Sequence, residues 1–434
     1  MLLAHGVGTR GDLPVPVELA ATAAGAVLVG TFVALGLLWR SPRLRGGEAG
    51  RPVPAPVARL VGSPVLRGVL RGLVLVAAVL VVVVGFAGPA QTPRNLAPWV
   101  FYVTFWVGLV PASLLLGPVW RVLNPLRSVH AGLAAVARID PEQGVRDLPA
   151  RVGLWPAAVS LAAFAWLELV SPEPADPRVV AGVLVGYALV HVGAALVFGR
   201  RWFAHGDGFE VWSTLLGSLA PIGRRDDGTL VWRNPADGLD AVRGRPGLVA
   251  VVLVLVGSTA FDGLSRSSLW ADNAPRGPLA ATLGLVVVTG VVTGLYLLGT
   301  WRPDPVRRAE PVRLPTAFAH TIVPIAAGYA VAHYFSLFLF DGQLPFVLAS
   351  DPFGTGADLL GTAGRAVDYT LVGTVTIAAV QVGAIVVGHV LAAVCAHDRA
   401  VQLFPPAIAV RIQYPLLAAM VVLTCGAVAL VLAP

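Results

Sequence analysis

Histidine side chains are concentrated in two long apolar segments near the C-terminus of this chain, residues 314–343 and 367–400. These segments hold four of the eight histidines: His320, His333, His389 and His397. Ionisable groups are costly in hydrocarbon, so such residues commonly mark a binding site, a proton path or a reaction centre. The sequence therefore predicts a functional site in this part of the chain.

Helix geometry divides the candidate residues into two groups at different depths. His320 and His333 are thirteen residues apart, which is about 20 Å at roughly 1.5 Å per residue, so they cannot share one ligand. An inner group of His320, His389 and His397 carries the imidazoles that bind a divalent metal or haem. We expect a metal site there, with haem as an alternative, unless His397 only completes a helix end.

An outer group combines one histidine with carboxylates. Its members are His333, Asp262, Asp341 and Asp368. Imidazole and carboxylates are the groups that a general base or a metal-activated water requires, so these are the predicted catalytic residues of a hydrolytic site. A structural alternative stays open for Asp262, because it precedes Arg266 by four residues and the two can pair on one helical face.

Further polar residues lie at depths compatible with these groups. Gln381 is predicted at mid-membrane, and His5 and Asp12 belong to an N-terminal tail on the outer side. Glu168 is predicted to reach water at the outer rim of its span. His191, near mid-membrane, is either a packing residue bonded to a backbone carbonyl or part of a site.

Composition places the chain among polytopic membrane proteins. It is 56% apolar and 13% charged, and it repeats apolar runs of the roughly 20 residues that one span needs. The predicted fold is all-α, with about ten transmembrane helices. They are placed near residues 17–38, 68–88, 97–117, 154–171, 179–199, 247–264, 279–300, 315–340, 368–397 and 414–433.

All 31 basic residues are arginine, and their positions predict how the spans are oriented. With both termini outside, the inside loops and the inner end of the second span, at Arg71, hold 25 arginines, and the outside segments hold 6. Short cytoplasmic loops carry the excess of positive charge, so we expect this orientation in the plasma membrane. The net charge of +7 then describes a surface that faces anionic lipid, and nucleic acid is not an expected partner.

The segments between spans form distinct regions of one membrane domain, residues 1–434. Residues 40–67 are a cytoplasmic linker rich in proline, glycine and arginine, which we expect to be irregular. Residues 118–153 and 200–246 are cytoplasmic loops, and residues 341–367 form an outer capping loop.

Two of these loops carry one-sided apolar stripes at helical spacing. The stripes are Val122, Leu126, Val129, Leu133 and Val136 in the first loop, and Phe209, Trp212, Leu215, Leu216 and Leu219 in the second. Amphipathic helices of this kind lie in the plane of the membrane interface. We therefore expect two interfacial helices on the inner face, with His130 solvated on the polar face of the first.

Several segments resemble a group of actinobacterial multi-span membrane proteins labelled fenitrothion hydrolase. They are residues 5–16, 258–265, 318–334, 351–362 and 387–400, with sequences such as STAFDGLS and DPFGTGADLLGT. The resemblance implies hydrolysis of organophosphate esters at a metal-assisted site. A small-molecule substrate is then expected.

Two other classes of protein stay open. The ten spans divide into two five-helix halves, and the third span of each half contains an internal proline, Pro111 or Pro324. Interrupted helices at matching positions are typical of secondary transporters built from inverted repeats. The inner histidines would instead suit a haem- or metal-binding membrane redox subunit.

Overall fold

The computed structural model describes residues 17–301 and 313–432, so His5 and Asp12 lie outside the described part. Helices dominate the described residues, and ten helical segments are long and apolar enough to cross a membrane. The predicted all-α, multi-pass membrane protein is thereby confirmed. The segments are Ala21–Leu38, Pro64–Ala87, Leu96–Leu116, Ala150–Leu169, Pro177–Phe198, Leu248–Arg266, Pro278–Thr300, Leu314–Leu348, Thr374–Leu403 and Arg411–Leu430.

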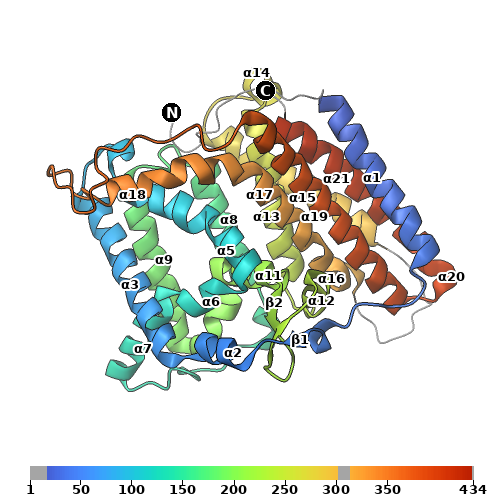
Figure 1. Ribbon diagram of the computed structural model, residues 1–434, viewed down its shortest axis with the longest axis horizontal. Coiled ribbons are helices and arrows are strands. Elements are labelled where there is room, and N and C mark those ends of the chain that lie inside the picture. Colours follow the sequence, from blue (N-terminus) through green and yellow to red (C-terminus); the bar gives the residue numbers. More distant parts are fainter. Residues whose placement is uncertain (1–16, 302–312, 433–434) are drawn as a thin grey trace. The chain divides into compact units, whose positions relative to one another are not determined.

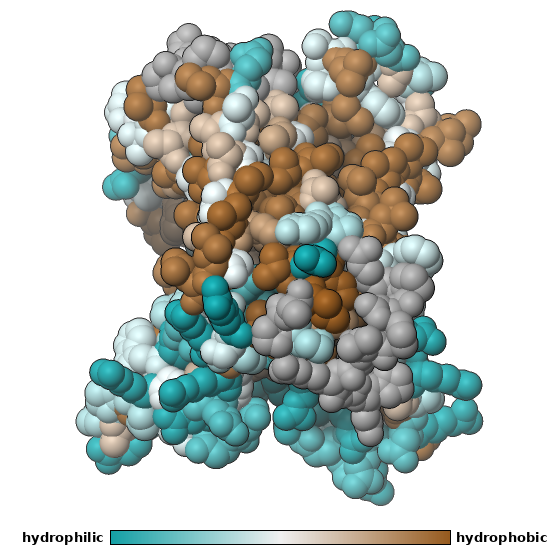
Figure 2. Space-filling model, turned by 90° about the vertical axis from the view of Figure 1, so that its right-hand side faces the viewer, coloured by the Kyte–Doolittle hydropathy of each residue, from teal (hydrophilic) through white to brown (hydrophobic). Residues whose placement is uncertain are grey.

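The hydrophobic surface expected of membrane-spanning helices is visible on one face of the molecule. On the face shown in Figure 2, hydrophobic side chains gather in a broad region and hydrophilic side chains gather below it. Many of the long helices also expose large apolar side chains, among them Val65, Leu73 and Val76 in one helix and Leu283 in another. Exposed apolar side chains are stable there only against lipid.

The chain divides into two compact units, which are described separately. The first covers residues 53–217 and 336–372, and the second covers the described parts of 9–52, 218–335 and 373–434. The first transmembrane helix belongs to the second unit together with four of the last five spans and the part of the eighth span before residue 336. The units therefore do not correspond to the two five-helix halves expected from the sequence.

In the first unit, α3 (Pro64–Ala87) lies beside α9 (Pro177–Phe198), and α7 (Pro125–Ala137) contacts both (Figure 1). Its core is aromatic: the Phe164 ring lies 4.5 Å from Trp106 and 5.2 Å from Phe209, between ring centroids. The remaining helices of this unit are α2 (Ala55–Gly62), α4 (Leu96–Trp99), α5 (Leu109–Leu116), α6 (Val119–Leu123), α8 (Trp155–Leu169), α10 (Phe203–Gly206), α11 (Gly208–Ser218) and α18 (Leu344–Leu348).

In the second unit, α1 (Val17–Leu38) packs beside α19 (Thr374–Leu403) and α21 (Tyr414–Leu432), as Figure 1 shows. A small core cluster of Ala24, Ala332, Ile385 and Val428 joins four of its helices. The others are α12 (Pro235–Asp240), α13 (Leu248–Arg266), α14 (Ser268–Asn273), α15 (Pro278–Thr300), α16 (Leu314–Phe318), α17 (Val323–Phe340) and α20 (Pro406–Ala409). A three-stranded antiparallel sheet, in the order β1 (Arg51–Pro52), β3 (Leu230–Trp232) and β2 (Ile222–Arg224), completes it.

The two spans that contain an internal proline are both irregular. In one, Pro111 cannot donate to the carbonyl of Val107, and the π-helical segment η3 (Val100–Val107) ends there. In the other, Pro324 cannot donate to the carbonyl of His320. That carbonyl instead accepts from the amide of Val323, at the end of the 3₁₀ segment η6 (Ala319–Ile322) between α16 and α17. The sequence thus located both interruptions correctly.

A close crossing of two helices fixes the N-terminal part of α17 against α19. A Cβ on Gly388 would lie 2.5 Å from the carbonyl oxygen of Pro324 and 3.3 Å from the Cα of Gly328. A Cβ on Gly328 would likewise lie 2.4 Å from the carbonyl oxygen of Ala384. Only glycine at both positions permits this approach, as small residues do at interfaces between membrane helices.

Several sequence predictions about polar and interfacial residues are wrong. Helix α11 exists, but its apolar stripe is buried in the first unit instead of facing lipid, because a stripe does not distinguish lipid from a protein core. His130 is 1% exposed, not solvated, and Glu168 is buried at 9% exposed, not at an open rim. The linker of residues 40–67 is only partly irregular, since it contains α2. Helix α7 does expose Val136, at 83%.

Candidate functional site

Asp262 lies in a buried charged group of the second unit. It belongs to α13, one turn before Arg266 at the end of that helix, and it is 2% exposed. Arg266 donates to both carboxylate oxygens over 2.8 to 3.1 Å, which confirms the predicted ion pair. His333 of α17 places its Nε2 atom 2.5 Å from Asp262 Oδ2. The structure therefore brings together two of the predicted catalytic residues.

The contact between His333 and Asp262 is close but not aligned. The two atoms are at hydrogen-bonding distance, yet Nε2 has no hydrogen-bond partner of good geometry among the described residues. A small rotation of the imidazole would align it, since the distance is already short enough. Tyr329, one turn earlier in α17, stacks on the imidazole ring at a centroid separation of 5.6 Å. The hydroxyl of Tyr329 is also buried and has no hydrogen-bond partner among the described residues.

The other two predicted catalytic carboxylates belong to the first unit. Asp341 lies in the 3₁₀ segment η7 (Asp341–Gln343) and is 8% exposed. Asp368 lies in the capping loop, where the hydroxyl of Thr370 donates to it over 2.6 Å and lowers its pKa. Its backbone amide also donates to the side chain of Gln343. These contacts give Asp368 the role of a loop-fixing residue.

The inner histidines are buried, but they are not gathered into a ligand set. His389 Nδ1 lies 2.8 Å from the carbonyl oxygen of Ile385 in its own helix, and the Nε2 atoms of His389 and His320 have no hydrogen-bond partner in the described chain. His397 uses both nitrogens, toward the carbonyl oxygen of Trp39 and the amide of Gln413. No three His, Cys, Asp or Glu side chains are grouped to hold a metal in residues 17–301 and 313–432.

Two of the remaining predicted residues are located by the structure. Gln381 lies in α19 and is partly buried. The Nδ1 atom of His191 accepts a hydrogen bond from Trp202 Nε1 over 3.1 Å, and Tyr187 packs on its ring at a centroid separation of 4.1 Å. His191 is thus held by aromatic neighbours.

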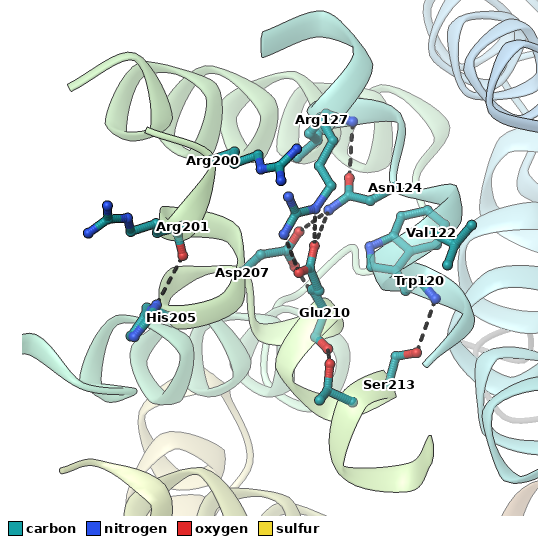
Figure 3. Close-up of polar contacts among 12 residues, drawn as sticks. Trp120, Val122, Asn124, Arg127, Arg200, Arg201, His205, Asp207, Glu210 and Ser213 are labelled. Carbon is teal, nitrogen blue, oxygen red and sulfur yellow. Dashed lines mark hydrogen bonds and ion pairs between the residues drawn. The ribbon is translucent and has the colours of Figure 1, made fainter. Parts of the chain in front are cut away.

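A second buried polar group, in the first unit, was missed by the sequence reasoning (Figure 3). Asp207 and Glu210 are both 0% exposed. Arg127 donates twice to Glu210, over 2.5 and 2.8 Å, and the side-chain amide of Asn124 donates to Asp207 over 2.7 Å. The hydroxyl of Tyr187 donates to Asp207 as well, over 2.7 Å. Two carboxylates therefore share one cation.

Local chain geometry fixes the residues of this second group. Asn124 is the N-cap of α7, where its side-chain oxygen accepts from the amide of Leu126 before Pro125 begins the helix. Asp207 caps α11 in the same way by accepting from the amide of Glu210. Burial raises the pKa of Asp207, although three hydrogen bonds oppose that shift. The sequence offered one signal for this group: two acids, Asp207 and Glu210, stand three residues apart at the start of a predicted helix.

An Asn–Pro pair begins a helix in the second unit as well. Asn234 caps α12 by accepting from the amide of Ala236, and Pro235 begins that helix. Asp240, at the end of α12, pairs with Arg399 over 3.0 Å. Each unit therefore uses an Asn–Pro cap to begin a short helix that joins a charged pair.

Comparisons of the chain with family models, with curated proteins and with solved structures found no match. The resemblance to fenitrothion hydrolases therefore stays an expectation from the sequence segments that carry it.

Proposed function

We propose that this protein is a secondary carrier of the plasma membrane and that the group of Asp262, Arg266 and His333 binds a proton during its transport cycle. The observation that carries the proposal is the contact of His333 with a carboxylate that is 2% exposed, between two membrane-spanning helices. Ionisable side chains in such positions mark ion and proton pathways.

The charges of this group depend on one proton. With neutral His333, the charges of Asp262 and Arg266 cancel; a proton on His333 leaves one net positive charge among buried residues. A net charge is costly where water is excluded. Protonation of His333 therefore favours a rearrangement of the group. Asp262 can align its hydrogen bond with His333, Arg266 can move toward solvent, or an anion can enter beside the two cations. Arg266 has room for this, because its side chain is 27% exposed.

The interrupted spans supply a second line of support for a carrier. His333 lies in α17, the helix that begins directly after the break at η6. The other interrupted span contains η3, in the first unit. Broken helices that leave backbone groups free for a substrate are typical of secondary transporters.

A phosphotriester hydrolase is the second candidate, and the same contact favours it. A carboxylate that holds one nitrogen of an imidazole fixes the tautomer in which the other nitrogen can take a proton from water. His333 would then be the general base and Asp262 its orienting partner. This candidate also agrees with the family resemblance.

Proteoliposomes that contain a pH-sensitive dye can separate the two functions. Solutes of several classes, including a nitrophenyl phosphotriester, are added outside, and both lumenal pH and released nitrophenol are recorded. A proton-coupled carrier acidifies or alkalinises the lumen with at least one solute and releases no nitrophenol. Hydrolysis of the phosphotriester itself releases a proton together with the nitrophenol, so the solutes that are not esters decide between the two functions. Release of nitrophenol with no change of lumenal pH for any of those solutes would reject the carrier in favour of the hydrolase.

Variants test whether Asp262 and His333 are required for the measured signal, either the change of lumenal pH or the release of nitrophenol. Asp262→Asn and His333→Gln should each abolish it, with the double variant little worse than either single one, because the two residues act as a unit. Asp272→Asn is the matched control: it removes the same charge from an exposed position of α14 in the same unit. Equal loss of the signal in that control would remove the role of the Asp262 group.

A further inference from the structure

Two arginines at the start of α3 form a positively charged surface that the proposed function does not use. Arg67 and Arg71 are four residues apart, so they project from the same face of the helix. Arg67 donates to the carbonyl oxygen of Gly62 over 2.5 Å, and the Nε of Arg71 donates to the carbonyl oxygen of Val122 over 2.8 Å. Both side chains are half-buried, which holds the two guanidinium groups in place.

Neither arginine has a carboxylate partner in the described chain. The ion pairs of the first unit join Arg127 to Glu210 and Arg200 to Glu142. Arg71 instead has further cations near it, since Arg127, Arg67 and Arg200 all act on it electrostatically. Like charges one turn apart repel each other. This surface therefore has an excess of positive charge that an anion would relieve.

The depth of the two arginines matches the phospholipid headgroups. The span Pro64–Ala87 has 24 residues, or about 36 Å at roughly 1.5 Å per residue, which exceeds a hydrocarbon thickness of about 30 Å. The excess of about 6 Å places Arg67 near the boundary of the hydrocarbon when the other end of α3 lies at the opposite boundary. Arg71 then lies about 6 Å deeper, within the reach of a long side chain that extends toward the headgroups.

The surface beside the arginines is apolar and open. Leu66, Leu70 and Leu73 follow one another at helical spacing on the flank of α3 next to the arginines, and they are between 36% and 62% exposed. Gly68 and Gly72, which follow the two arginines directly, have no atom within 4 Å of the place that a Cβ would occupy. A soluble anion gains nothing from this apolar surface, whereas the acyl chain of a lipid can lie along it.

We propose that Arg67 and Arg71 together bind the phosphate of an anionic phospholipid, with its acyl chains along the exposed face of α3. Guanidinium groups suit this ligand because their N–H donors match phosphate oxygens in pairs. The negative charge of the lipid would balance the excess of arginine at this end of the first unit. By the predicted orientation, the lipid belongs to the cytoplasmic leaflet, where anionic headgroups attract basic residues.

Binding of fluorescent phosphatidylglycerol to the detergent-purified full-length protein tests this site. Each exposed arginine near a membrane surface contributes about a fivefold factor to such binding. Arg67→Gln and Arg71→Gln should therefore each weaken binding about fivefold, and the double variant about 25-fold. Arg365→Gln is the matched control, because it removes an exposed arginine of the same unit that makes no ion pair in the described chain and lies in the loop predicted on the outer side. It should leave the affinity unchanged.

Other lipids and variants make the result decisive. Phosphatidylcholine should bind more weakly than phosphatidylglycerol, and inorganic phosphate should not displace the labelled lipid. Replacing both arginines with lysine keeps the charge and should restore most of the binding, even if the glutamine variants fold poorly. Equal binding to the double glutamine variant, equal binding of phosphatidylcholine, or displacement by inorganic phosphate at equal concentration would each overturn the proposal.

Discussion

Removing Arg266 should destabilise the protein more than removing its partner Asp262. The two side chains differ in exposure, at 27% for Arg266 and 2% for Asp262. In Arg266→Gln, a buried carboxylate loses the three hydrogen bonds that it accepts from the arginine, which should cost about 3–5 kcal/mol. In Asp262→Asn, the remaining guanidinium can reach water, so we expect about 1–3 kcal/mol.

Unfolding in mixed detergent micelles, followed by the fluorescence of the 11 tryptophans, measures both free energies. The double variant should cost less than the sum of the single ones by about 2 kcal/mol, because residues in direct contact are coupled. Two results would refute this reasoning: a larger loss in Asp262→Asn than in Arg266→Gln, or additive losses. Either would mean that Asp262 is not held mainly by Arg266.

Three further measurements test the fold and its orientation. Gly388→Ala should destabilise the protein by about 1–3 kcal/mol through its clash with a backbone carbonyl, whereas Gly383→Ala, which meets nothing within 4 Å, should be neutral or stabilising in the same unfolding assay. Burial lowers the pKa of His130 from 6.5. The contribution of His130 to stability is therefore present above pH 6.5 and is lost as the pH falls below 6.5, by at most about 1.4 kcal/mol per pH unit. The free energy of unfolding of His130→Gln should accordingly depend less on pH between pH 7 and 5. A cysteine at Ser171 should react with an impermeant thiol reagent on intact cells and one at Gly228 should not, and the opposite pattern would contradict the predicted orientation.

The spans were predictable because apolar runs of membrane length leave few alternatives. The breaks in two spans were predictable too, since proline removes one particular hydrogen bond. The environment of single residues was not. Glu168 and His130 were placed in water, and α11 against lipid, because hydropathy does not report which faces other helices cover. That information exists only once the helices are packed.

The two buried polar groups also differ in how far the sequence predicts them. Asp262 and Arg266 are four residues apart on one helix, so their pairing follows from helical geometry, and depth counting along the spans brought His333 to the same group. The group in the first unit was missed because Asn124 and Asp207 are 83 residues apart. Nothing in the spacing of two segments so far apart in the sequence predicts that their side chains meet.

Hydrogen bonding indicates which of these buried groups has a functional role. Asp207 is satisfied by Asn124, Tyr187 and a backbone amide, and Glu210 by Arg127, so that group has the completeness of a structural network. Beside Asp262, in contrast, Tyr329 Oη and His333 Nε2 are buried without a well-formed hydrogen bond to the described chain. Leaving a buried polar atom unbonded costs about 1–3 kcal/mol. Such a cost is expected at a site that takes up a proton or a ligand, so it supports the role proposed for Asp262 and His333 and supports none for Asp207.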